Sequence, residues 1–76
     1  MNNTHYALIN GDNDVVAVIK KYGFKGRVIP AIEDETGAEV ESVTIDQIEY
    51  NSFKVTAKLI GHEVVYESVL RPTWEY

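Results

Sequence analysis

Two runs of alternating residues, joined by a Gly-His pair, constrain this chain more than any other feature. Residues 53–59 carry apolar side chains at every second position, and residues 63–70 alternate again after Gly61 and His62. Such alternation is typical of strands with one buried face, because successive side chains point to opposite sides. A two-residue loop with glycine first predicts a type II′ turn. The two runs therefore predict a β-hairpin.

The apolar positions also predict the register of this hairpin. Its buried face pairs Phe53 with Leu70, Val55 with Ser68, Ala57 with Tyr66 and Leu59 with Val64, and its other face pairs Lys54 with Val69, Thr56 with Glu67 and Lys58 with Val65. A shift by one residue would distribute the apolar side chains over both faces.

Residues 15–22 have two competing interpretations. Apolar residues at i, i+3, i+4 and i+7 indicate one face of a helix, capped by Asp12 or Asp14 and ended by Gly23. The β-branched content of the same run favours a strand, hairpinned to a short candidate strand over residues 5–9. The complete set of end signals favours the helix.

The middle of the chain predicts two further strands. Residues 27–33 form the first, in which Pro30 indicates an edge or a bulge, and a turn with Gly37 at a position that tolerates positive φ follows. Residues 39–50 form the second, with a bulge at residues 46–47 that keeps Val43 and Ile45 on the buried face. With residues 51–52 as the next loop, Glu49 faces Lys54 as an ion pair.

These elements predict one α+β domain over residues 1–76: a small antiparallel sheet of four or five strands in meander hairpins, with one helix packed on one face. The alternative is an all-β, SH3-like small barrel. A chain of this length lies near the lower limit for folding on its own core, so oligomerisation is a natural supplement. Exposed sheet edges also permit a homodimer, unless Pro30 blocks one of them.

Composition narrows the function classes. The chain has no cysteine and a net charge of −5. It has no apolar run near the roughly 20 residues that span a bilayer and no signal-peptide core, so we expect a cytoplasmic protein without a membrane partner. The acidic balance argues against general binding of nucleic acid.

Two groups of residues are candidates for contact with a protein partner. The carboxylates Glu33, Asp34, Glu35, Glu39 and Glu41 cluster around one turn, and such a face can imitate nucleic-acid phosphates. Trp74 and Tyr76 belong to residue types that are enriched at interface anchors. The alternatives are a solubilising surface for the acids and packing on the domain itself for the aromatic residues.

A basic segment is the candidate for anions: Lys20, Lys21, Lys25 and Arg27. Residues 23–28, Gly-Phe-Lys-Gly-Arg-Val, resemble over six residues the glycine-and-basic turn of KOW-type RNA-binding barrels, which implies RNA binding. The P-loop spacing is missing. The alternative is a solvated turn with favourable cations.

Catalytic and metal-binding constellations are not predicted. His5 and His62 lie far apart in the sequence, and no serine carries a supporting motif. Asn10, Asp12 and Asp14 resemble the start of a calcium loop, but the sixth and twelfth positions hold Val15 and Lys21 instead of glycine and glutamate. We therefore expect a turn, no enzyme activity and no cofactor.

The sequence thus predicts a non-enzymatic protein-binding module that acts through an acidic face and terminal aromatic residues. Small acidic domains of this kind resemble, at the level of class and without a shared motif, phage-encoded proteins that inhibit host proteins. One alternative is a nucleic-acid or nucleotide-binding domain that uses the basic segment. Another is an oligomeric small-ligand binder.

Overall fold

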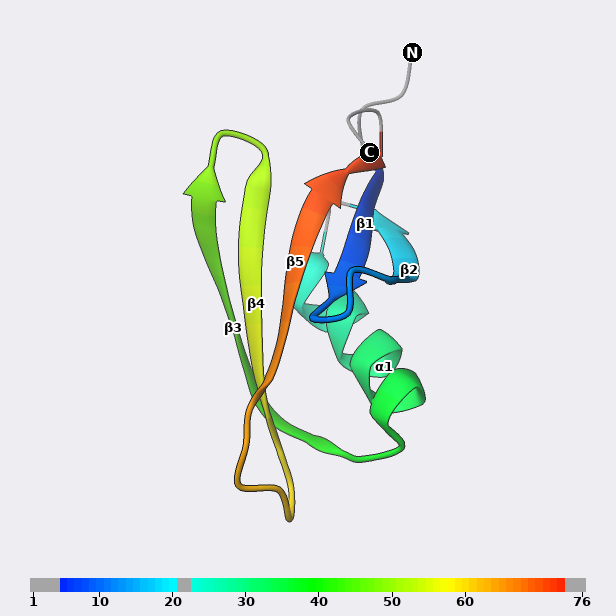
Figure 1. Cartoon of the computed structure of the whole chain (residues 1–76), viewed down its shortest axis with the longest axis vertical. Helices are drawn as coiled ribbons and strands as arrows, with labels where there is room; N and C mark the ends of the chain where they lie inside the picture. Colours follow the sequence, from blue (N-terminus) through cyan, green and yellow to red (C-terminus); the bar gives the residue numbers. More distant parts are fainter. Residues whose placement is uncertain (1–4, 21–22, 74–76) are drawn as a thin grey trace.

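The described part of the chain forms one sheet of five antiparallel strands with one helix on one face (Figure 1). The computed structural model describes residues 5–20 and 23–73. The elements are β1 (His5–Asn10), β2 (Val15–Lys20), α1 (Phe24–Thr36), β3 (Val40–Glu49), β4 (Ser52–Leu59) and β5 (Tyr66–Pro72), and the strand order is β2-β1-β5-β4-β3. The predicted α+β class is confirmed. The sheet is not closed into a barrel, so the alternative fold is wrong.

The helix predicted over residues 15–22 is wrong. Residues 15–20 form β2, which pairs antiparallel with β1, as the competing interpretation expected. Lys21 and Tyr22 lie outside the described residues. The β-branched residues form a strand here because they pair with β1. The residues that looked like helix ends belong to other elements: the aspartates to the β1–β2 turn and Gly23 to the start of α1.

The strand predicted over residues 27–33 is also wrong, because this segment lies inside α1. Phe24, Val28 and Ile32 recur every four residues and place one apolar face of the helix against the sheet. Gly23, with φ of 76°, precedes α1 as its N-cap instead of ending an earlier helix. Pro30 lies within the helix and blocks no sheet edge.

Gly37 ends the helix. Its φ is 72°, and its N–H donates to the carbonyl of Glu33 at 2.8 Å. The predicted positive φ is therefore confirmed, although the chain turns here at a helix end and not between two strands. A left-handed glycine after the last helical residue commonly satisfies the free carbonyls of a helix end.

The β4–β5 hairpin has the predicted register over its paired part, from Phe53 opposite Leu70 to Ala57 opposite Tyr66. The loop differs. His62 N donates to the carbonyl of Leu59, and Gly61 is the second central residue of that turn with φ of 82°, which fits type II and not type II′. Type II turns do not follow the twist of paired strands.

The strands therefore diverge beyond Ala57 and Tyr66. Two predicted pairs, Leu59 with Val64 and Lys58 with Val65, do not form, and Val64 is 80 % exposed. Leu59 and Lys58 pair with β3 on their other side.

The β3–β4 register is shifted from the prediction. Asp46 lies opposite Lys54 and Glu49 opposite Ser52, so the predicted Glu49–Lys54 ion pair is wrong. The irregularities fall at Glu41 and Ile48 instead of residues 46–47. Val43 is nevertheless buried and Ile45 half-buried against the core, as expected.

The core lies between α1 and the sheet. Tyr6 of β1, Phe24 of α1 and Phe53 of β4 pack edge to face, with ring centroids 5.0 to 6.0 Å apart. Because α1 connects the two edge strands, its first turn follows β2 and its last turn leads into β3. The helix runs obliquely across one face of the sheet, and its last turn points towards the end of the molecule that holds the β4–β5 loop (Figure 1).

Candidate functional site

The five predicted acidic residues lie where α1 passes into β3, and we call this set the acidic end. Glu33, Asp34 and Glu35 form the last turn of α1, and Glu39 and Glu41 follow Gly37. This segment and the β4–β5 loop lie at the same end of the molecule (Figure 1).

Two carboxylates of the acidic end have structural contacts. Glu33 is half-buried, and its Oε2 accepts the backbone N–H of Val40 at 3.0 Å. Glu35 Oε2 accepts from Asn10 Nδ2 at 3.4 Å, which links α1 to the turn between β1 and β2. The remaining three side chains, Asp34, Glu39 and Glu41, are exposed.

The turn after β1 brings two further carboxylates into the same region. Asn10 Oδ1 accepts the backbone N–H groups of Asp12 and Asp14 at 2.9 and 3.0 Å. This geometry confirms the predicted turn, although β2 follows it instead of a helix, so neither aspartate is a helix cap.

Tyr66 lies within the electrostatic field of these carboxylates. The hydroxyl of Tyr66 is buried without a hydrogen-bond partner among the described residues. Its burial raises the pKa of Tyr66 above the ordinary value, and the charges of Glu35 and Asp12 raise this pKa further. Carboxylates from α1 and from the β1–β2 turn therefore act on one point in space.

The charged side chains of α1 have the same sign as the macrodipole at both ends of the helix, which is unfavourable for its stability. The first turn contains Lys25 and Arg27 and no acid, and the last turn contains Glu33, Asp34 and Glu35 and no base. A helix N-terminus carries a partial positive charge and a C-terminus a partial negative charge. The side chains therefore strengthen the field at each end instead of compensating it.

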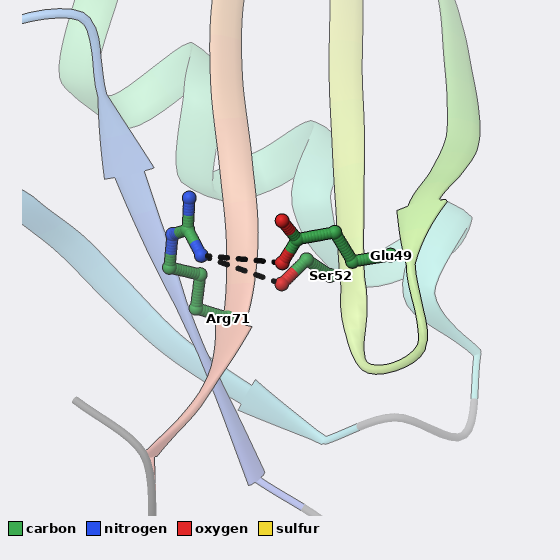
Figure 2. Close-up of polar contacts among 3 residues, drawn as sticks. All are labelled: Glu49, Ser52 and Arg71. Carbon is green, nitrogen blue, oxygen red and sulfur yellow. Dashed lines mark hydrogen bonds and ion pairs between the residues drawn. The ribbon is translucent and has the colours of Figure 1, made fainter.

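Two carboxylates on the sheet face away from α1, the open face, are paired with cations. Lys54 Nζ lies 3.8 Å from Glu67 Oε2, and Arg71 Nη1 lies 4.0 Å from Glu49 Oε1 and 3.5 Å from Ser52 Oγ. Figure 2 shows the guanidinium of Arg71 facing the adjacent side chains of Glu49 and Ser52. These are the ion pairs between described residues, and neither includes the acidic end.

The predicted anion-binding residues are only partly brought together. Lys20 and Arg27 line one cavity of about 410 Å³, which we call the basic groove: His5, Val18, Ile19, Lys20, Gly26, Arg27 and Pro30. Lys25 is exposed on α1 and is not among the lining residues, and Lys21 lies outside the described residues. Residues 23–28 form the helix start and not a barrel turn, so the structural basis of the RNA-binding resemblance is wrong.

The sequence did not predict which elements of the fold form the walls of this groove. His5 comes from β1, where it pairs with Lys20, and Gly26 and Pro30 come from α1. The spacing of Phe24, Val28 and Ile32 could have revealed the helix that supplies the second wall.

A smaller hollow of about 210 Å³ on the open face was also not predicted. Ile9, Ile48 and Val69 contribute apolar side chains to it, and the Lys54–Glu67 pair lies beside them. Ile48 is 49 % exposed at the irregularity of β3. The change of phase within residues 39–50 was the signal for that irregularity.

The remaining predictions have different outcomes. Trp74 and Tyr76 lie outside the described residues.

In the described ranges, no group of histidine, cysteine, aspartate or glutamate side chains is arranged to hold a metal ion. The absence of enzyme activity and of a cofactor, and the nucleic-acid and small-ligand alternatives, stay predictions. No helix in the described part of the chain has the length and apolar content that crossing a bilayer requires.

Comparison with protein families, with curated proteins and with solved structures gives no match for this chain. Its function has to be inferred from its own geometry.

Proposed function

We propose that this protein is a non-enzymatic binding module whose acidic end docks on a basic surface of a partner protein. The observation that carries the proposal is the exposure of Asp34, Glu39 and Glu41 without an ion-pair partner among the described residues. Such carboxylates complement a groove lined by lysine and arginine and accelerate association with it. An inhibitor that occupies such a groove is the activity we favour.

The charges on α1 support this proposal. An acidic residue at a helix C-terminus typically costs about 0.3–1 kcal/mol of stability, and a chain of this size has only roughly 3–5 kcal/mol in total. Glu33 and Glu35 have structural hydrogen bonds, but Asp34 is exposed in the last turn and is poorly explained by stability alone. A role in binding explains Asp34, because functional residues are commonly retained at the expense of stability.

The contrast with the open face also supports it. Glu49 and Glu67 have cations within 4.0 Å, so their fields are partly cancelled. At the acidic end, the negative end of the helix dipole adds to the charge of carboxylates without an ion-pair partner among the described residues. Together they produce a negative electrostatic potential, which would attract a basic partner as it approaches.

Two matched variants test this proposal. The first neutralises the acidic end with Asp34→Asn, Glu39→Gln and Glu41→Gln, and the second neutralises the open face with Asp46→Asn, Glu49→Gln and Glu67→Gln. Both remove the same charge and leave Glu33 and Glu35 intact. Tagged wild type and both variants are used to capture proteins from nuclease-treated host lysate, and the captured protein is then titrated in purified form.

We expect wild type and the open-face variant to bind the same purified protein with similar affinity. The acidic-end variant should bind it at least about tenfold more weakly, with a reduced salt dependence. Equal affinities for the two variants would overturn the assignment of the acidic end.

A further inference from the structure

The basic groove lies beside β2, which is an edge strand of the sheet. This strand pairs with β1 on one side, and no strand of the sheet in the described residues lies on its other side. Val18, Ile19 and Lys20 all line the groove although successive strand residues point to opposite faces. Three successive residues of an edge strand therefore line the groove, together with His5 of the paired strand β1 and with residues of α1.

This edge is the less protected of the two. The other edge strand, β3, carries Glu41, Asp46 and Glu49 and two irregularities, which are devices that discourage strand addition. The run Val15–Ile19 has no charged residue, and Val18 is 56 % exposed. One irregularity lies at Val16, so the regular part of β2 is residues 17–20, where the groove lies.

The second wall of the groove comes from α1. Gly26 and Pro30 lie one helical turn apart, and Pro30 has no N–H to donate to the carbonyl of Gly26. That carbonyl is therefore an acceptor without its usual helical donor. A strand edge beside a helix, with main-chain groups on both sides, is a setting in which proteins bind extended peptides.

The charge of the groove selects the occupant. Lys20 of β2 and Arg27 of α1 are cations of its lining, and the start of α1 adds its positive partial charge, in a chain whose net charge is −5. An arginine and a lysine that line one cavity suit a carboxylate, because both donate charge-assisted hydrogen bonds to its oxygens.

We propose that the basic groove binds an extended acidic segment of a protein, which adds to β2 as a sixth strand. Its backbone pairs with residues 17–20, an apolar side chain packs on Val18 or Pro30, and its carboxylate reaches Lys20 and Arg27. This site lies at the opposite end of α1 from the acidic end and does not depend on the function proposed above.

Selection from a phage-displayed library of random short peptides tests the proposal on the full-length protein. We expect the enriched peptides to combine β-branched residues with at least one Asp or Glu. The double variant Lys20→Gln/Arg27→Gln should bind them about tenfold or more weakly, because it removes the charge-assisted hydrogen bonds to the carboxylate of the peptide. The matched control Lys54→Gln/Lys58→Gln, on β4, should bind them like wild type.

Three further probes distinguish other occupants. A selected peptide with N-methyl groups on alternate residues keeps its charge but cannot pair with a strand, so its binding should be lost. Amidation of the peptide C-terminus tells a terminal carboxylate from an acidic side chain. Inorganic phosphate and a labelled single-stranded oligonucleotide should bind more weakly than the selected peptides.

Several outcomes would overturn the proposal. They are enrichment of no peptide or of basic peptides only, equal binding by the two double variants, undiminished binding of the N-methylated peptide, or tighter binding of the oligonucleotide. Circular dichroism of both double variants establishes that a loss of binding is not a loss of fold.

Discussion

Glu33 and Val40 are joined by a hydrogen bond of 3.0 Å in which the carboxylate Oε2 accepts the backbone N–H. The bond connects the last turn of α1 to the first residue of β3, across the left-handed Gly37. It fixes the direction in which the chain leaves the helix. One of the carboxylates predicted to contact a partner thus has a role inside the protein.

Replacement of Glu33 should therefore affect stability more than binding. Glu33→Ala leaves the N–H of Val40 without its acceptor and should lower the free energy of unfolding by about 1–2 kcal/mol. Glu33→Gln keeps a carbonyl acceptor and should lose less. Glu41→Ala, an exposed control, should change the unfolding free energy by less than about 0.5 kcal/mol. Urea denaturation followed by circular dichroism measures all three.

Stability and binding should separate at Asp34. Asp34→Lys places a cation at the C-terminal end of α1 and should raise the unfolding free energy by about 0.3–1 kcal/mol. The same change should weaken binding of a basic partner. Lys25→Glu, at the first turn, should stabilise by a similar amount without affecting that partner. A destabilised Asp34→Lys protein would contradict the dipole argument.

The hairpin of β4 and β5 shows what alternation alone can predict. The pairs from Phe53 with Leu70 to Ala57 with Tyr66 follow from the apolar pattern, because a shift would expose the core. The loop did not follow, because Gly61 tolerates either central position of a turn and the pattern does not distinguish them. Val64 therefore lies exposed in the loop and not on the buried face.

The two wrong predictions on either side of Gly23, a helix before it and a strand after it, have one local cause. A glycine with positive φ can end one helix or precede the next, and the sequence on both sides fits either. If Gly23 ends the preceding segment, the sequence predicts a helix over residues 15–22 and a strand over residues 27–33. Two tertiary contacts decide between these structures: β2 pairs with β1, and Val28 and Ile32 pack on the sheet. The secondary-structure propensities of the local sequence do not include such contacts.

The candidate sites were predictable to different degrees. Clustering in sequence identified the acidic end, because its residues lie on one continuous segment. The basic groove combines His5 with residues of β2 and α1, so only the fold brings its walls together.

Two glycines, one inside α1 and one at its end, should respond oppositely to alanine. Gly37 has φ of 72° and open space where a side chain would begin, so Gly37→Ala should cost about 1–2 kcal/mol through backbone strain alone. Gly26 is inside the helix, has no positive φ and also has open space, so Gly26→Ala should stabilise by about 0.5–1 kcal/mol. Thermal unfolding of both variants tests the sign.

Removal of the Ser68 hydroxyl should stabilise the protein. The side chain is buried on β5, and its Oγ has no hydrogen-bond partner among the described residues. A buried polar atom without a partner costs about 1–3 kcal/mol, so Ser68→Ala should raise the unfolding free energy by about 1 kcal/mol. Ser42→Ala, exposed on β3, is the matched control and should have no effect. A loss of stability in Ser68→Ala would mean that Oγ is hydrogen-bonded.

Tyr66 should make the protein less stable in alkali. Because burial and the charges of Glu35 and Asp12 raise its pKa in the folded state, the folded protein keeps the phenol proton above about pH 10, where the unfolded chain loses it. The unfolded state then binds fewer protons than the folded state, so the free energy of unfolding falls as the pH rises from about 10 through the raised pKa. Below about pH 10 the contribution is fully present.

Tyr66→Phe should abolish this alkaline step and, because it removes a buried hydroxyl without a partner among the described residues, should not destabilise the protein at neutral pH. Urea unfolding at a series of pH values measures the step, and the difference between the ultraviolet titrations of wild type and Tyr66→Phe gives the ionisation of Tyr66 itself. Glu35→Gln should move that ionisation part of the way back towards its ordinary range, because burial is the larger cause. An alkaline step of the same size in wild type and Tyr66→Phe would assign it to another group.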